Sequence, residues 1–159
     1  MAFLPMEWVV SRVPKLRIRK GHAVRDSNRT SIVQRIPAAN PADALDHFNR
    51  LLALETDCSD VNASLEAGDL DFVLLDVRVR ESYMAGHIPG ALSLPYRQID
   101  EAALSAYPRG TLFVVYCDGP HCNGADQAGA RIASLGRPVK KMIGGVAGWK
   151  DEHLDLEIG

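Results

Sequence analysis

The chain has 159 residues, of which 47% are hydrophobic and 24% charged, and this composition predicts one soluble globular domain with a buried core. The formal net charge of -2 gives no reason to expect a nucleic-acid or membrane partner. No apolar run approaches the roughly 20 residues that a membrane-spanning helix needs. Three cysteines are too few for a disulfide framework and suit a reducing compartment, so the cytoplasm is the expected location.

Residues 1–37 form a basic arm that shows neither a helical nor an alternating hydrophobic pattern. Residues 1–40 contain eight Lys or Arg and two acidic residues, so this part carries about +6 and the rest of the chain about -8. The arm is interpreted as a segment of uncertain order before a domain at 38–159. Four alternatives stay open: a flexible tail, a start codon assigned too far upstream, an organelle-targeting segment, and a segment lying against the acidic domain.

The first signals in chain order are two helices. Asn40-Pro41 combines an N-cap with a proline at the first helical position, which indicates a helix over about 41–53. Ser59 is the expected N-cap of a second helix, and Gly68 is the residue expected to end it. Both helices precede the first strand signal.

Three short apolar runs are typical of strands that are buried on both faces. They cover residues 72–75, 112–116 and 139–143. Helices are expected between and around these strands, at about 80–85, 98–106 and 124–136. Strands that alternate with helices predict an α/β fold in which a parallel sheet carries helices on both faces.

Cys117 is the candidate nucleophile, because it directly follows the strand at 112–116 and precedes a glycine-rich loop. In parallel sheets, functional sites form beyond the carboxyl ends of the strands. A loop at this place can turn backbone amides inward, and the next helix adds a partial positive charge, so a thiolate is stabilised. Gly119 and Gly124 are interpreted as residues that let the loop curl, and Pro120 stiffens it.

Three motifs, in this order and at this spacing, resemble the signatures of the rhodanese family. They are LLDVRVRESYMAGHIPGALSLP (74–95), VVYC (114–117) and MIGGVAGW (142–149), and they indicate a family core over roughly 59–150. The resemblance implies a rhodanese-like α/β fold around a five-stranded parallel sheet. It also implies a sulfurtransferase that uses no metal or organic cofactor. Cys117 would take a sulfane sulfur from a small-molecule or protein donor, hold it as a persulfide, and pass it to an acceptor.

The resemblance extends to residues outside the loop. Asp76 and Arg78 match the family's Asp-Val-Arg motif, in which a buried ion pair braces the first loop, so a supporting role is expected. His87, in the Gly-His-Ile-Pro-Gly stretch, is interpreted as a packing and turn residue rather than a base. Trp149 matches the closing motif and is interpreted as a core residue.

The loop after Cys117 departs from the family's usual length and charge. It consists of Asp118, Gly119, Pro120, His121, Cys122, Asn123 and Gly124. Phosphatase and arsenate reductase relatives use Cys-x5-Arg to bind a dianion, whereas Asn stands at position 123, so this alternative is a minor one. The missing cation and the charge of Asp118 favour a donor less charged than thiosulfate, such as a thiol persulfide. His121 is available as an acid or base.

Three interpretations of Cys122 stay open. It can line the loop, it can act as a resolving thiol that accepts sulfur from Cys117 or forms a disulfide with it, or it can bind a metal with Cys117 and His121. A curled loop can bring two Cα atoms within disulfide range, whereas Cys-x4-Cys is not standard zinc spacing.

A function from another class also stays open, namely a non-catalytic rhodanese module that binds a protein partner. The presence of Cys117 argues against this alternative, whereas the unusual loop and the additional helix at 41–53 argue for it. The sequence indicates no particular oligomeric state.

Overall fold

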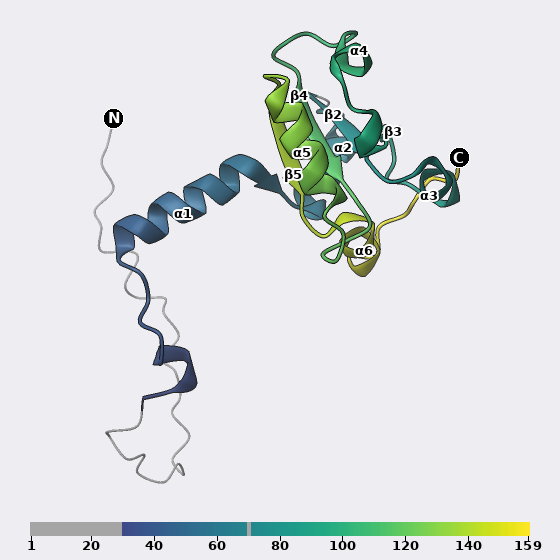
Figure 1. Cartoon of the computed structure of the whole chain (residues 1–159). Coiled ribbons are helices and arrows are strands. Elements are labelled where there is room, and N and C mark those ends of the chain that lie inside the picture. The colour runs from purple at the N-terminus through teal and green to yellow at the C-terminus, as the bar shows by residue number, and fades with distance from the viewer. Residues whose placement is uncertain (1–29, 70) are drawn as a thin grey trace, which may run out of the picture. The chain divides into compact units, whose positions relative to one another are not determined.

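The computed structural model describes residues 30–69 and 71–159 (Figure 1). The chain divides into two units, one up to Ala39 and one from Asn40 onward. In the described part of the first unit, a short 3-10 helix, η3, covers Ile32–Gln34. The rest of the basic arm, residues 1–29, lies outside the described residues.

Five parallel strands form one sheet in the second unit, in the order β1-β5-β4-β2-β3 (Figure 1). Their bounds are β1 Glu55–Thr56, β2 Phe72–Asp76, β3 Leu92–Ser93, β4 Leu112–Tyr116 and β5 Val139–Met142. The expected α/β fold with a five-stranded parallel sheet is therefore confirmed. The two edge strands, β1 and β3, have two residues each. They are too short to leave a hydrophobic pattern in the sequence.

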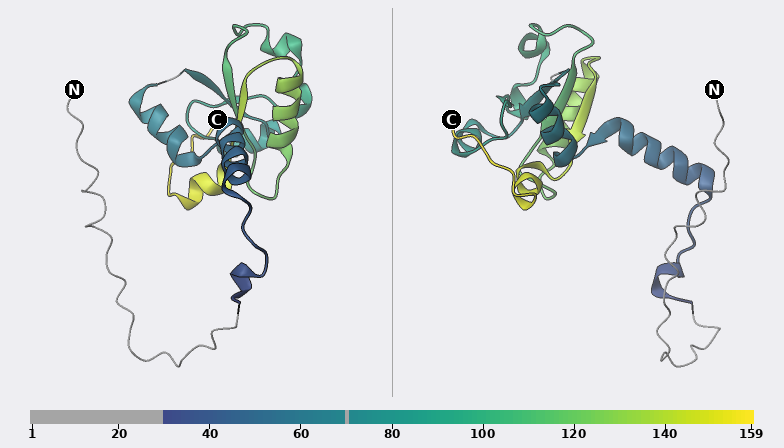
Figure 2. Two further views of the ribbon diagram at one scale, coloured as in Figure 1. Left: turned by 90° about the vertical axis from the view of Figure 1, so that its left-hand side faces the viewer. Right: turned by 180° about the vertical axis from the view of Figure 1, so that it is seen from behind.

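Helices cover both faces of this sheet (Figure 2, left). The helices of this unit are α1 Pro41–Leu54, α2 Cys58–Ala67, α3 Arg80–Ala85, η4 Tyr96–Gln98, α4 Glu101–Leu104, α5 Gly124–Ser134 and α6 Gly145–Asp151. Helix α1 does not cover the sheet but extends away from it (Figure 1). Because side chains alternate along a strand, β4 contributes to two cores. Phe113 and Val115 pack with residues of α5, whereas Val114 and Tyr116 pack with residues of α2 and α6.

Two helix starts differ from the sequence-based expectation. The N-cap of α2 is Asp57 rather than Ser59, and its carboxylate accepts a backbone hydrogen bond of 2.8 Å. A carboxylate at this position also interacts favourably with the helix dipole. The helix expected over 98–106 is replaced by η4 and the short α4, because Asp100 caps a new helix start with a backbone hydrogen bond of 2.8 Å.

Helix α1 is capped by Asn40, as expected, but its apolar side chains are not buried. Leu45, Phe48 and Leu52, whose spacing places them on one face of the helix, are each more than half exposed. The exposed face bears on the partner-binding alternative, because large exposed apolar patches often mark interaction sites. Over residues 30–69 and 71–159, no helix is both long and apolar enough to cross a membrane.

Candidate active site

Cys117 lies directly after the central strand β4, where the chain turns toward α5. The alternation along β4 places its side chain in the core on the α5 side, and the residue is 5% exposed. Two pockets, of about 330 and 320 Å³, both include Cys117 in their lining. The expected nucleophile is therefore a nearly buried sulfur with space on two sides.

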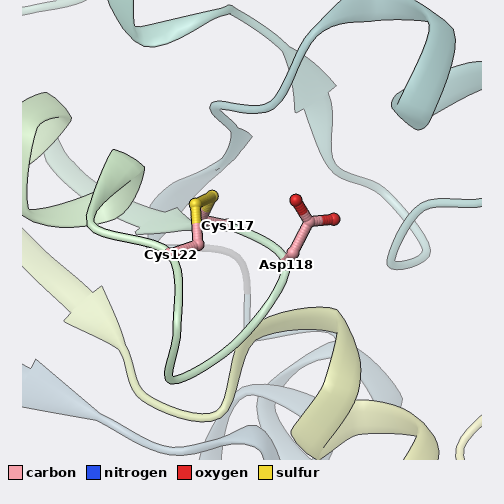
Figure 3. A group of neighbouring side chains, drawn as sticks. All are labelled: Cys117, Asp118 and Cys122. Atoms are coloured by element: carbon pink, nitrogen blue, oxygen red, sulfur yellow. A yellow bond between two sulfur atoms is a disulfide. The ribbon is translucent and has the colours of Figure 1, made fainter.

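Cys122 is joined to Cys117 by a disulfide (Figure 3). The two Cα atoms are 6.3 Å apart, which lies within the usual range for disulfides. The loop turns back within this interval, because Cys122 N donates to Gly119 O at 3.0 Å. The sequence left three interpretations of Cys122 open, and the structure agrees with the one in which Cys122 forms a disulfide with Cys117.

The metal set that the sequence suggested does not form. Among the described residues, the side chains close enough to share a metal ion are Cys117, Asp118 and Cys122, with ligand atoms within 4.8 Å of one another. His121 is exposed and is not part of this group. Sulfur atoms in a disulfide are not thiolate ligands, so this group fits a metal only after reduction.

The two loop glycines, Gly119 and Gly124, provide space for the atoms around the loop. Neither Gly119 nor Gly124 has a positive φ. A Cβ on Gly119 would lie 2.9 Å from the Ala147 side chain. A Cβ on Gly124 would lie 2.9 Å from Cys117 Sγ and 3.3 Å from Cys122 Sγ. These glycines therefore allow α6 and the two sulfur atoms to approach the loop.

The loop amides do not converge on Cys117 as expected. Among the described residues, the amide that donates to a loop sulfur is Gly124 N, and its acceptor is Cys122 Sγ at 3.4 Å. The first amides of α6 donate to carbonyls instead, from Val146 N to Cys117 O at 3.0 Å and from Ala147 N to Asp118 O at 2.7 Å. The loop is thus held by α6, and the amino end of α5 faces Cys122.

Arg78 connects the first loop with the active-site loop. Its Nη2 lies 2.7 Å from the fully buried Asp76 carboxylate, and its Nη1 lies 3.2 Å from Asp118 Oδ1. Burial alone would lower the pKa of Arg78, but hydrogen bonds to Asp76 and Asp118, together with their charges, more than offset it, so the pKa is raised. The expected Asp76–Arg78 pair is present, and its reach to Asp118 is a contact that the sequence did not indicate.

The pocket on the α3 side of Cys117 contains cations that come from outside the loop. Arg78 and Arg97 line it. Arg97 Nε donates to Tyr96 Oη at 3.0 Å, and among the described residues no carboxylate forms an ion pair with Arg97. Reasoning from the loop alone missed Arg97, because it is 20 residues before Cys117 in the chain.

The pocket on the β5 side of Cys117 contains a cation that is already paired. Lys141 Nζ lies 2.8 Å from Asp126 Oδ1 and 3.1 Å from Glu55 Oε1. The hydrogen bond that Lys141 Nζ donates to the Asp126 carboxylate is the main reason that the pKa of Lys141 is raised. Arg131, the nearest arginine after the loop, lines neither pocket. The dianion-binding arginine of the phosphatase alternative therefore has no counterpart in α5.

His87 and Trp149 have the packing contacts that the sequence suggested. The His87 ring stacks on Tyr83 with 3.7 Å between ring centroids, and the residue is buried. Trp149 is also buried, and its Nε1 donates to Asp155 O at 2.8 Å. Neither residue lines the pockets beside Cys117.

Comparison with known protein families identifies the family of this fold. The profile of the rhodanese-like domain matches residues 57–152. The chain belongs to this family. A curated relative, the HTH-type transcriptional regulator Rv0324 from Mycobacterium tuberculosis, is 35% identical over 94 residues. The match covers 59% of this rhodanese-like chain and 40% of the regulator, so the chain spans less than half of that relative.

Solved structures agree with the family. The BH2092 protein from Bacillus halodurans is 37% identical with a TM-score of 0.72, and the match covers 75% of this chain and 87% of that one. The rhodanese-like domain of the Alr3790 protein from Anabaena sp. is 31% identical with a TM-score of 0.59. That match covers 66% of this chain and 79% of the Anabaena domain.

Proposed function

We propose that this rhodanese-like chain is a sulfurtransferase that carries a sulfane sulfur on Cys117. The observation that supports this function is the position of Cys117 at the carboxyl end of the central strand, nearly buried and bordered by two pockets. Such a sulfur is accessible to a small donor while most of its surface is shielded from water, which limits side reactions of a persulfide.

The proposed reaction has two half-reactions. The Cys117 thiolate attacks the sulfane sulfur of a donor R–S–SH, and the thiolate RS⁻ leaves, so that Cys117 carries a persulfide. A nucleophilic acceptor then attacks the outer sulfur, and Cys117 leaves as a thiolate. Ping-pong kinetics follow from this sequence. The disulfide with Cys122 must be reduced before the first step, which suits a cytoplasmic location.

A thiol persulfide is the proposed donor, in preference to thiosulfate. The charge of Arg78 is shared between Asp76 and Asp118, and the Asp118 side chain, which is 66% exposed, places a negative charge beside the sulfurs. Both facts disfavour a small dianion. The guanidinium of Arg97 is available to bind the carboxylate of a donor such as glutathione persulfide.

The choice of donor is tested by comparing kcat/KM for thiosulfate and for glutathione persulfide. We expect the persulfide to be the better substrate. Arg97→Gln should raise KM for the persulfide and leave kcat nearly unchanged. The guanidinium would bind the donor carboxylate equally well in the ground state and in the transition state, so its loss weakens donor binding without slowing the chemical step. A strong preference for thiosulfate would contradict this choice of donor.

The sulfur carrier is tested by intact-mass measurements on the fully reduced protein after exposure to several sulfane donors. Wild type, Cys117→Ser and Cys122→Ser are compared. We expect a sulfur adduct on Cys122→Ser and none on Cys117→Ser. An adduct that survives in Cys117→Ser but is lost in Cys122→Ser would assign the carrier to the other cysteine.

A non-catalytic module that binds a protein partner is the second candidate. Two observations favour it: the curated relative is named as a transcriptional regulator, and α1 carries an exposed apolar face. The same mass measurements separate the two functions, since a binding module would show no sulfur adduct with any donor.

A further inference from the structure

We propose that Cys122 is a resolving thiol, which attacks the persulfide on Cys117 and releases hydrosulfide. This inference rests on the proposed function, because it needs the Cys117 persulfide as its starting point. The protein would then have a second activity, the reduction of sulfane sulfur to sulfide. The Cys117–Cys122 disulfide is the state that each turnover of this activity leaves behind.

The step balances within the chain. The Cys122 thiolate attacks Cys117 Sγ, so the Sγ–Sγ bond forms and the bond from Cys117 Sγ to the outer sulfur breaks. The bonding electron pair leaves with the outer sulfur as HS⁻. Two cysteine thiols are oxidised to a disulfide, and one sulfane sulfur is reduced to sulfide. An external dithiol then reduces the disulfide and is itself oxidised, which returns both cysteines to thiols.

The geometry of the loop favours attack on the inner sulfur. The backbone holds the two Cα atoms 6.3 Å apart, which places both Sγ atoms at bonding range without an inserted sulfur. Gly124 leaves the space for this arrangement, because a Cβ there would lie 2.9 Å from Cys117 Sγ and 3.3 Å from Cys122 Sγ. Attack on the outer sulfur would instead place an additional atom between the two Sγ positions.

The surroundings of the two sulfurs favour Cys122 as the attacking thiolate. Gly124 N, the first amide of the 11-residue helix α5, donates to Cys122 Sγ at 3.4 Å. An amide hydrogen at the positive end of a helix stabilises negative charge on sulfur. Cys117, in contrast, is the cysteine at the end of the central strand, and that position suits the carrier.

The disulfide remains accessible to a reductant. Both cysteines line both pockets, the one beside Arg97 and the one beside Lys141. A small dithiol can therefore approach from either side. The Asp118 carboxylate, within 4.8 Å of both sulfurs, disfavours retention of an anion, so HS⁻ is not held at the site.

The test is a single turnover of the full chain without oxygen. The protein is reduced with dithiothreitol, freed of the reductant and mixed with one equivalent of glutathione persulfide, and hydrosulfide is measured together with intact mass and free thiols. Wild type should release one HS⁻ per chain and lose two thiols. Cys122→Ser should retain one added sulfur atom and release HS⁻ at least about tenfold more slowly, because only external thiols remain to attack.

Cys58→Ala is the matched control, because it removes the third cysteine, which is buried and donates to Ile143 O and Gly145 O. It should release hydrosulfide as wild type does. Equal release from wild type and Cys122→Ser, or a stable adduct on wild type without release, would overturn the resolving role and leave the sulfur carrier intact. A Cys122→Ser protein that takes up no sulfur from any donor would instead refute the proposed function itself.

Discussion

Replacing Arg78 by alanine should lower the free energy of unfolding by about 3–5 kcal/mol, the range for breaking a buried ion pair. Asp76 is fully buried. Its carboxylate accepts from Arg78 Nε at 3.0 and 3.1 Å, from Nη2 at 2.7 Å, and from the Arg78 backbone amide at 3.0 Å. The variant removes every hydrogen bond from the Arg78 side chain to this carboxylate, so a buried charge loses its compensating cation. The Gly86 carbonyl also loses its 2.7 Å hydrogen bond from Nη2.

The second ion pair of Arg78, with the exposed Asp118, should contribute much less to stability than the pair with Asp76. Asp118 is largely exposed and lies 3.2 Å from Nη1, so Asp118→Asn should cost only about 0–1 kcal/mol. Arg80→Ala, which removes an exposed arginine two residues away, should stay within about 0.5 kcal/mol of wild type.

Urea denaturation with linear extrapolation, under one fixed redox condition, measures all three variants. The reasoning is refuted if Arg78→Ala costs less than about 1 kcal/mol, or if Asp118→Asn costs as much as Arg78→Ala.

Three further predictions concern the support of the site. Tyr116→Phe should cost about 1–3 kcal/mol in urea denaturation, because the buried Ile88 amide loses its 3.1 Å acceptor; no loss would mean that water or another group replaces the phenol. Gly145→Ala should destabilise the fold by at least about 1 kcal/mol and slow persulfide formation, because Gly145 has a φ of 58° and a Cβ there would overlap Cys117 O. Wild-type kinetics and stability in that variant would contradict the close packing of α6. Burial, followed by the charges of Glu152 and Asp57, raises the pKa of Cys58 from an ordinary 9.0 to about 11. Between pH 9 and about 11, the native state therefore keeps the thiol proton that the unfolded state has lost. The contribution of this thiol to the free energy of unfolding is fully present below pH 9 and is lost as the pH rises toward 11. In Cys58→Ala, the free energy of unfolding should fall by about 2–3 kcal/mol less over this pH range than in wild type. If the free energies of unfolding of the two proteins change with pH in parallel, the raised pKa of Cys58 is contradicted.

Much of the fold was predictable because its signals are local. The apolar runs at 72–75 and 112–116 identified two central strands, and the three motifs led to the rhodanese-like family. The strand β1 was not predictable, because Glu55 and Thr56 carry no hydrophobic pattern and are a strand only through pairing with β5. The cap of α2 was misplaced by two residues, since Asp57 and Ser59 are both capable N-caps and the sequence pattern alone did not choose between them.

The sequence by itself determined that Cys117 stands between a buried strand and a helix, because this depends only on the order of residues along the chain. It also determined that the loop contains no arginine or lysine. Only the tertiary structure decided what surrounds the sulfur: the disulfide with Cys122, the contact from Arg78 to Asp118, and the presence of Arg97 in the adjoining pocket. These contacts depend on how the loop folds back on α5 and how β2 pairs with β4, which bring together groups that are distant in the chain.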